Sequence, residues 1–405
     1  MLITIPIAGY VSADRDPPGP VMNSGRDYLQ TRFKIDRPLD PNALTLTPDL
    51  SSKYVYQDQF VHFLRKKAPG AQLMFSLDNE PELWDSTHKE IHPQPATYTE
   101  VLAKDVAYAK AVKEVDPTAP VTGPVSYGWD GYLSLQNAPD SAEYGNFLDW
   151  WMRQVSAADA KAGAKLINDL DLHWYPEATG DGHRIIDAGV SPGEAAAREQ
   201  APRSLWDASY VEKSWITQWT TDGKGIDLIP RLQAEIAANN PGMNLDFSEW
   251  DYGATDDISG GIATADVLGV FGRYGVHAAD FWEMSGSNAY AYGAFAVFRN
   301  YDGHGAAFGD TEVQASTTDN LTTSVYASTD AASPSRVVIV AINKSRGPTM
   351  ATIELKGAVA THASVYTLTN AAPRPRPGSG LTASVPNQFS YLMPAQSVSV
   401  IVPRR

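Results

Sequence analysis

The regular alternation of short apolar runs with longer amphipathic segments over the first 300 residues most constrains the fold of this chain. The short runs have the length of buried strands, and the longer segments repeat their apolar residues with the period of a helix. Strands that alternate with helices predict parallel βα units. The predicted strands are Ile3–Val11, Gln72–Leu77, Pro120–Val125, Leu170–Trp174, Leu245–Phe247 and Val276–Trp282. The predicted helices are Tyr54–Lys67, Thr97–Val115, Phe147–Ala160, Leu228–Ala238, Ile262–Tyr274 and Ala289–Arg299.

This pattern predicts an α/β fold of the TIM-like (β/α)8 barrel type. It contains only six βα units, however, whereas a closed barrel of this kind needs eight. The segment 176–227 does not supply the missing units, because it is rich in Pro, Gly and Trp and reads as loop.

The last part of the chain has a different pattern. Residues 309–405 consist of short β-branched runs separated by turn residues, which is typical of an antiparallel β-sandwich. They carry 5 acidic and 8 basic residues, although the whole chain has a net charge of −15, and none of the 10 tryptophans lies beyond Trp282. We therefore predict two domains, a barrel-like catalytic domain over 1–308 and a β-sandwich over 309–405.

Composition excludes several classes of function. A net charge of −15 argues against binding nucleic acid through its phosphates, which requires a basic surface. The absence of cysteine excludes disulfides and thiolate metal sites. No apolar stretch approaches 18 residues, so no membrane span is predicted. The first residues also lack the basic n-region of a signal peptide.

Two glutamates follow predicted strands and are the strongest candidates for catalysis. Glu80 lies in Ser76–Pro81 (SLDNEP), and Glu249 lies in Phe247–Gly253 (FSEWDYG). Barrel active sites are assembled from the carboxyl ends of different strands. Two carboxyl groups there favour retaining glycoside hydrolysis, in which one protonates the leaving oxygen and the other attacks the sugar. The structural alternative is that each motif only ends a strand in an acidic turn.

Polar and aromatic residues near the predicted strand ends are candidates for substrate binding. Asn79 offers both a donor and an acceptor beside Glu80, which suits a sugar 2-hydroxyl. His173 either orients a catalytic carboxylate or is a satisfied buried polar group. Aromatic planes bind the apolar faces of sugars, although a single tryptophan more often belongs to a core. Trp84 and Trp282 are the strongest aromatic candidates, and the others are Tyr10, Tyr175, Trp215 and Trp219.

Several segments spread over nearly the whole chain resemble glycoside hydrolase family 44, the endoglucanases and xyloglucanases. They are residues 4–11, 77–84, 171–178, 201–207, 248–253, 257–263 and 299–303. The resemblance implies a TIM-like barrel with an attached β-sandwich. It also implies that Glu80 is the acid/base and Glu249 the nucleophile. The substrate-stacking tryptophans of the family correspond to Trp84, Trp215, Trp219 and Trp282.

This chain departs from the family pattern in two respects. In the second motif Trp250 replaces a tyrosine and Ala254 replaces a glycine, close to the expected nucleophile. Family catalytic modules also carry further residues before the segment Ile3–Val11, which supply the first two barrel strands. The six strands here are then expected to be strands 3 to 8. We therefore expect this chain to be a truncated product. Poor solubility or weak activity is expected, because an open barrel exposes sheet edges and apolar interior.

The function predicted from the sequence is a retaining endo-β-1,4-glucanase that hydrolyses cellulose-type glucans or xyloglucan by double displacement. One alternative is a truncated glucan-binding remnant with little or no activity, and another is the same mechanism acting mainly on xylan. No cofactor is required, although acidic loops such as Asp256-Asp257 offer oxygen ligands for a structural calcium ion. The expected partner is a β-glucan polysaccharide, with no nucleic acid or membrane. A complete chain is expected to be a monomer, and the resemblance implies secretion.

Overall fold

The computed structural model describes residues 1–14, 20–282, 284, 286–357 and 359–405. By packing, the chain divides into two compact units. The first comprises Met1–Trp174, Arg231–Trp250 and His277–Asp280, and the second comprises the remaining segments Tyr175–Pro230, Asp251–Val276 and Phe281–Arg405. These units group residues by contact, so the domain boundary expected near residue 308 stays a prediction.

A six-stranded sheet forms the centre of the first unit. Its order is β1-β5-β6-β7-β10-β11, and the β1–β5, β5–β6, β6–β7 and β7–β10 pairs are parallel. This confirms the prediction of parallel βα units and is consistent with a TIM-like barrel. The strands are β1 (Leu2–Ile5), β5 (Met74–Leu77), β6 (Val121–Ser126), β7 (Asp169–Trp174), β10 (Asn244–Trp250) and β11 (Ala278–Phe281).

The first predicted strand is shorter in the structure than expected. β1 ends at Ile5, and the chain then turns away, because the backbone N–H groups of Ile7 and Ala8 donate to a side chain, Asp78, instead of a strand. Gly9 has a φ of 113°, which disfavours other residues. The next strand joins a separate three-stranded sheet of β2 (Tyr10–Ser12), β3 (Phe33–Arg37) and β4 (Tyr54–Tyr56).

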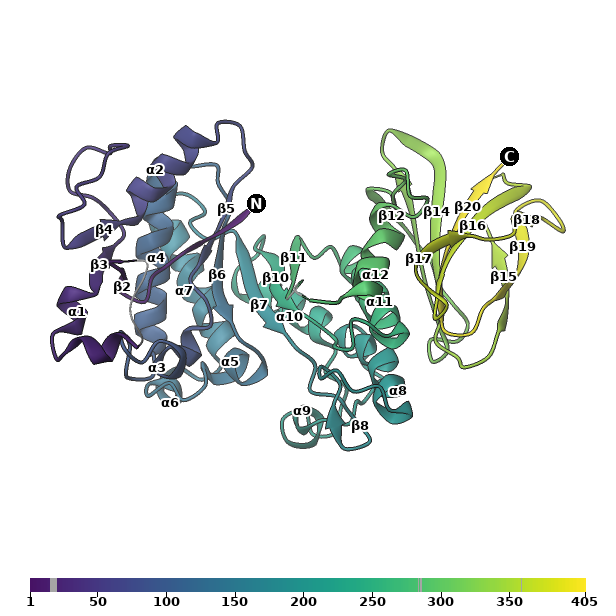
Figure 1. Ribbon diagram of the computed structural model, residues 1–405, viewed down its shortest axis with the longest axis horizontal. Coiled ribbons are helices and arrows are strands. Elements are labelled where there is room, and N and C mark those ends of the chain that lie inside the picture. The colour runs from purple at the N-terminus through teal and green to yellow at the C-terminus, as the bar shows by residue number, and fades with distance from the viewer. Residues whose placement is uncertain (15–19, 283, 285, 358) are drawn as a thin grey trace. The chain divides into compact units, whose positions relative to one another are not determined.

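Helices cover the sheet of the first unit. α2, α4 and α7 pack side by side, and α4 contacts β5 and β6 (Figure 1). Thr97 caps α4 by accepting from the Glu100 N–H at 3.0 Å, and Asn146 caps α7 by accepting from the Asp149 N–H at 2.9 Å. The main helices are α2 (Gln57–Lys67), α4 (Tyr98–Val115), α7 (Phe147–Ala162) and α10 (Leu228–Asn239), the last of which begins in the second unit. The shorter ones are η1 (Val21–Ser24), α1 (Tyr28–Thr31), η2 (Pro81–Leu83), α3 (Trp84–Thr87), α5 (Trp129–Ser134) and α6 (Ser141–Tyr144).

The second unit combines helices with antiparallel sheets. Its helices are α8 (Pro192–Gln200), η3 (Ala201–Leu205), α9 (Trp215–Trp219), α11 (Ile258–Tyr274) and α12 (Ala289–Arg299), and β8 (Thr179–Gly180) pairs with β9 (His183–Arg184). Within the described residues, no helix has both the length and the apolarity that a bilayer crossing requires.

Two antiparallel sheets make up the C-terminal part of the second unit. One has the order β12-β13-β14-β20-β16-β17 with β18 beside β16, and the other is the pair β15-β19. Buried side chains from both sheets, among them Ile339, Val365, Phe389 and Tyr391, form one hydrophobic cluster. The strands are β12 (Thr311–Val313), β13 (Thr323–Asp330), β14 (Ser333–Asn343), β15 (Thr349–Glu354), β16 (His362–Thr369), β17 (Ala372–Pro377), β18 (Leu381–Thr382), β19 (Gln388–Met393) and β20 (Ser397–Arg404).

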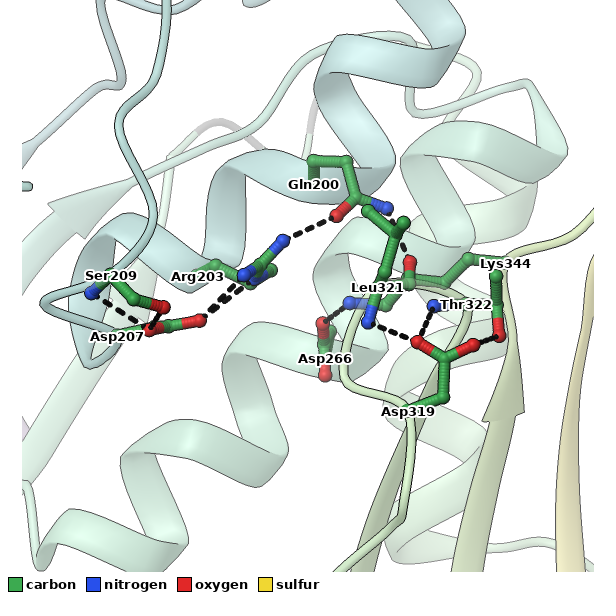
Figure 2. A network of polar contacts seen from close by, with 9 residues as sticks. All are labelled: Gln200, Arg203, Asp207, Ser209, Asp266, Asp319, Leu321, Thr322 and Lys344. Atoms are coloured by element: carbon green, nitrogen blue, oxygen red, sulfur yellow. Dashed lines mark hydrogen bonds and ion pairs between the residues drawn. The ribbon is translucent and has the colours of Figure 1, made fainter.

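A buried ion pair ties helix α11 to the larger of these sheets (Figure 2). Lys344 Nζ lies 2.6 Å from Asp266 Oδ2, and both side chains are 1% exposed. Tyr326 on β13 donates its hydroxyl to Asp266 Oδ1 at 2.6 Å. In the same unit Gln200 donates to the carbonyl of Leu321 at 2.7 Å. The carboxylate of Asp266 therefore has a charge partner and a neutral donor, as a buried charge requires.

Candidate active site

A strained turn carries Glu80. β5 ends at Leu77, and both Asp78 and Glu80 then have left-handed backbones, with φ of 63° and 44°. Such a conformation in a residue other than glycine costs about 1–3 kcal/mol and persists only where its surroundings hold it. Here the Asp78 carboxylate accepts from the Ala8 N–H at 2.9 Å, and the Glu80 N–H donates to the carbonyl of Val125 at 3.0 Å. The turn is thus held from the segment after β1 and from β6.

The neighbouring strand β6 is irregular at the same level. Val125 has a φ of 59°, an unfavourable conformation for a β-branched side chain. The pairing of β6 with β7 shifts register between Pro124 and Ser126. Bulges and strained residues gather at functional sites, where they aim side chains. The strain around Glu80 therefore marks this end of the sheet as the candidate active site.

A second bulge positions Glu249. The pairing of β10 with β7 shifts register between Phe247 and Glu249, so that Glu249 lies opposite His173. If the same residues paired without the bulge, Ser248 would lie opposite His173 and Glu249 would point to the other face of the sheet. The N–H of Ser248 instead donates to Asp171 Oδ1 at 2.9 Å.

His173 lies between the two glutamates. Its side chain is fully buried, and its Nδ1 is 2.8 Å from Glu80 Oε1 and 3.4 Å from Glu249 Oε2. The side chains of Glu80 and Glu249 are 21% and 19% exposed, which leaves both carboxyl groups accessible. One oxygen of each glutamate and the imidazole nitrogen all lie within 4.8 Å of one another. The structure therefore brings together the two glutamates and the histidine singled out from the sequence.

The surroundings of this group perturb several ionisable side chains. Burial lowers the pKa of His173, but its hydrogen bond to Glu80 and the charges of Glu249 and Asp171 outweigh that effect and raise it overall. Burial raises the pKa of Glu82 to about 7, although a hydrogen bond from Ser126 opposes the rise. Burial also raises the pKa of Asp171 to about 6 against the nearby charge of His173. Perturbed groups clustered in this way are typical of active sites.

Trp84 occupies a place different from the one expected. Its ring is fully buried, and its Nε1–H donates to the carbonyl of Asn79 at 3.0 Å. The ring also meets His92 edge to face, with centroids 5.1 Å apart. The Trp84 ring therefore supports the Asn79–Glu80 turn through this hydrogen bond. Because neither face of the ring is exposed, it offers no surface for a sugar in this conformation.

The remaining predicted residues are divided between the units. In the first unit, Tyr10 on β2 and Asn79 in the turn are half-buried. In the second unit, Trp219 on α9 is 71% exposed and Trp282 is 55% exposed. Tyr175 and Trp215, also of the second unit, are half-buried.

Sequence reasoning missed four residues that support the site. Asp78 accepts from the β1 turn, Glu82 pairs with Ser126, and the hydroxyl of Tyr132 donates to the carbonyl of His173. Asp171 precedes His173 by two residues on β7, so both side chains project from the same face. A signal was present, because Asp169, Asp171 and His173 alternate with leucines along a strand whose residues are all buried.

Two groups of side chains in the first unit have a spacing compatible with a metal ion. One is Glu80, His173 and Glu249. The other lies at the opposite end of the strands, where His277 Nδ1 is 2.9 Å from Asp169 Oδ1 and 3.4 Å from Asp246 Oδ1. Hydrogen-bonded ion pairs account for both spacings. The calcium predicted near Asp256-Asp257 stays a prediction, and Asp257 caps α11 by accepting from the Ser259 N–H at 2.8 Å.

Comparisons with known proteins agree on one family. The model of glycoside hydrolase family 44 matches residues 1–178. Endoglucanase A of Paenibacillus lautus is 39% identical over 419 residues, which cover 99% of this chain but only 58% of that protein. The structure of a Paenibacillus polymyxa xyloglucanase from family 44 is 37% identical, with a TM-score of 0.94 over 100% of this chain and 80% of that one. Cel44A, an endoglucanase of Clostridium thermocellum from the same family, is 38% identical, with a TM-score of 0.94 over 100% and 81%.

Proposed function

The chain belongs to glycoside hydrolase family 44, and from this membership and the geometry of its carboxyl pair we propose that it is a retaining endo-β-1,4-glucanase. Its substrates are proposed to be cellulose-type glucans and xyloglucan, the polysaccharide of the xyloglucanase to which it is similar.

The observation that carries this proposal is the separation of the two glutamates. One oxygen of Glu80 lies within 4.8 Å of one oxygen of Glu249. Retaining enzymes hold their carboxyl groups about 5–5.5 Å apart, whereas inverting enzymes hold them about 6.5–9.5 Å apart to admit a water molecule. The short spacing supports direct attack by one glutamate, and therefore retention.

In the proposed mechanism Glu80 protonates the glycosidic oxygen while Glu249 attacks the anomeric carbon. A covalent glycosyl-enzyme forms, and the part of the chain on the leaving side departs. Glu80, now a carboxylate, takes a proton from water, which attacks the anomeric carbon and releases Glu249. Two carboxyl groups suffice for both steps, so the proposed reaction requires no cofactor.

Azide rescue tests the assignment of the nucleophile. Glu249→Ala should lose turnover of an activated aryl β-cellobioside, and added azide should restore it with the α-glycosyl azide as product. Azide attacks from the face that the carboxylate occupied, which explains the α configuration. Glu114→Ala, which changes an exposed glutamate of α4, serves as the control and should keep full activity. A β-glycosyl azide, or no rescue at all, would contradict the proposal.

The exposed rings are proposed to bind the sugar chain. Trp219 and Trp282 present open faces of the kind that stack on pyranose rings. Tyr10, Asn79, Tyr175 and Trp215 are proposed as further contacts with the polysaccharide. Replacing Trp219 by alanine should raise KM for long glucans more than it lowers kcat.

We also propose a detailed architecture and a location for this chain. The parallel sheet is proposed to correspond to strands 3 to 8 of a (β/α)8 barrel, and the two C-terminal sheets to form a β-sandwich around their shared cluster. The working location is proposed to be extracellular, where polymeric glucans are found.

A further inference from the structure

One donor faces two acceptors at the centre of the candidate active site. A ring nitrogen of histidine carries at most one proton, so Nδ1 of His173 has a single N–H to donate. The 2.8 Å contact with Glu80 Oε1 has hydrogen-bond length, whereas the 3.4 Å contact with Glu249 Oε2 is longer than a normal bond. A small rotation of the ring or of a carboxylate would move the short contact to Glu249, the glutamate that carries the charge before glycosylation.

We propose that His173 is a positioning residue whose one N–H is shared between Glu80 and Glu249 and follows the negative charge between them during catalysis. This inference rests on the proposed function and adds to it a role for a residue that need not touch the sugar.

The charge moves during both steps of the double displacement. In glycosylation Glu80 gives its proton to the leaving oxygen and becomes a carboxylate, while the Glu249 carboxylate forms the bond to the anomeric carbon and loses its charge. In deglycosylation water transfers its proton to Glu80, its oxygen bonds to the anomeric carbon, and Glu249 leaves as a carboxylate. A donor between the two glutamates stabilises whichever is charged, so neither step strands an unpaired carboxylate.

The protein holds His173 firmly enough for this role. The side chain is fully buried, and the residue's carbonyl accepts from the hydroxyl of Tyr132. Its Nε2 is buried without a hydrogen-bond partner among the described residues, so the ring is anchored through Nδ1. β6 contributes Ser126, an uncharged group. The ionisable groups that face the imidazole are Glu80 from the turn after β5, Glu82 from η2, Asp171 from β7, Glu249 from β10 and Tyr132 from α5.

Histidine-labelled protein allows an NMR test that does not depend on turnover. The His173 signal is assigned by its loss in His173→Gln, and its titration is followed in the full chain. Glu80→Gln and Glu249→Gln should each lower the pKa of this imidazole by about one unit, because each exchanges one of the two carboxyl groups facing its N–H for a neutral amide. A shift in only one variant, or in neither, would overturn the sharing of the proton.

Steady-state kinetics provide a second test of the role of His173. On a cello-oligosaccharide, His173→Gln should lower kcat/KM about 100-fold, the loss expected when reacting groups are misplaced by about 1 Å. Both limbs of the pH profile should move upward by about one unit, because the N–H donor that favours the two carboxylates is gone. A loss of activity with unmoved limbs would indicate a structural role only and would refute the inference.

His277→Gln is the matched control, because it removes the same kind of contact from Asp169 and Asp246 at the other end of the strands. Its pH profile should coincide with that of the wild type, and an equal shift there would overturn a specific role for His173. If the unmodified chain releases no reducing sugar from any β-1,4-glucan, the proposed function fails, while the NMR arm still decides the inference about His173.

Discussion

The ion pair between Asp266 and Lys344 should contribute strongly to the stability of the second unit. Asp266→Asn removes the charge that compensates a buried ammonium group, while Tyr326 can still donate to the amide oxygen. Breaking a buried pair in this way costs about 3–5 kcal/mol.

The resulting change in melting temperature is large enough to measure. The second unit contains about 200 residues, and a domain of that size loses about 2–4 °C for each kcal/mol. We therefore expect Asp266→Asn to lower the Tm of this unit by about 10 °C. Thermal melts and urea unfolding of Asp266→Asn, Lys344→Met and the double variant complete a double-mutant cycle. The double variant should be more stable than the sum of the single losses implies, because it leaves no unpaired charge in the interior.

A partly exposed pair serves as the control. Arg336 and Asp330 lie at the surface of the same unit, with side chains 31% and 28% exposed. Asp330→Asn should cost less than about 1 kcal/mol, since solvent screens such pairs. If Asp266→Asn proves as mild as the control, or if the cycle is additive, the ion pair does not stabilise this unit.

Three further perturbations test the first unit. Burial raises the pKa of Asp105 to about 8, so this acid holds its proton in the folded state. Its contribution to stability is complete below pH 4 and is lost as the pH rises to 8. Asp105→Asn keeps an acceptor for Trp151 and should remove about 3 kcal/mol of pH dependence from the free energy of unfolding, measured in urea between pH 5 and pH 8. Asp78→Ala deprives buried backbone N–H groups of their acceptor and should cost about 3 kcal/mol, with a fall in kcat, and unchanged urea unfolding would contradict this. Trp84→Phe removes the donor to Asn79 and should lower kcat while glucan binding in affinity electrophoresis stays the same, whereas weaker binding would restore the stacking role.

The sequence pattern was sufficient for the six strands of the central sheet, but it missed β3 and β4 and the local irregularities of the strands. All six predicted strands correspond to strands of one sheet, because apolar runs between helices report burial directly. Ile3–Val11 was too long, since the interruption depends on Asp78, which is 71 residues from Ile7 and 70 from Ala8 in sequence. The burial of Trp84 was missed because it depends on packing with residues outside the motif, among them His92 and Lys104.

The candidate site was partly predictable. Glu80 and Glu249 were identified because strand ends meet at one edge of a parallel sheet, which local sequence reveals. The place of His173 between them depends on the register of β7 and β10, and the bulge that sets this register has no clear local signal. The roles of the exposed rings of the second unit stay predictions.

The bulge at Ser248 makes the site sensitive to chain length in a way that amino-acid identity does not reveal. Because Ser248 is the residue that the bulge adds to β10, substitutions at position 248 should be widely tolerated, while deletion of its codon removes the N–H that donates to Asp171 and should lower activity. Insertion of one residue between Ser248 and Glu249 should inactivate the protein, because it would move Glu249 out of register with His173. Insertions and deletions at this position should therefore change activity more than substitutions do. Designs that graft the FSEWDYG segment onto another barrel need to transfer the count of residues along with their chemistry.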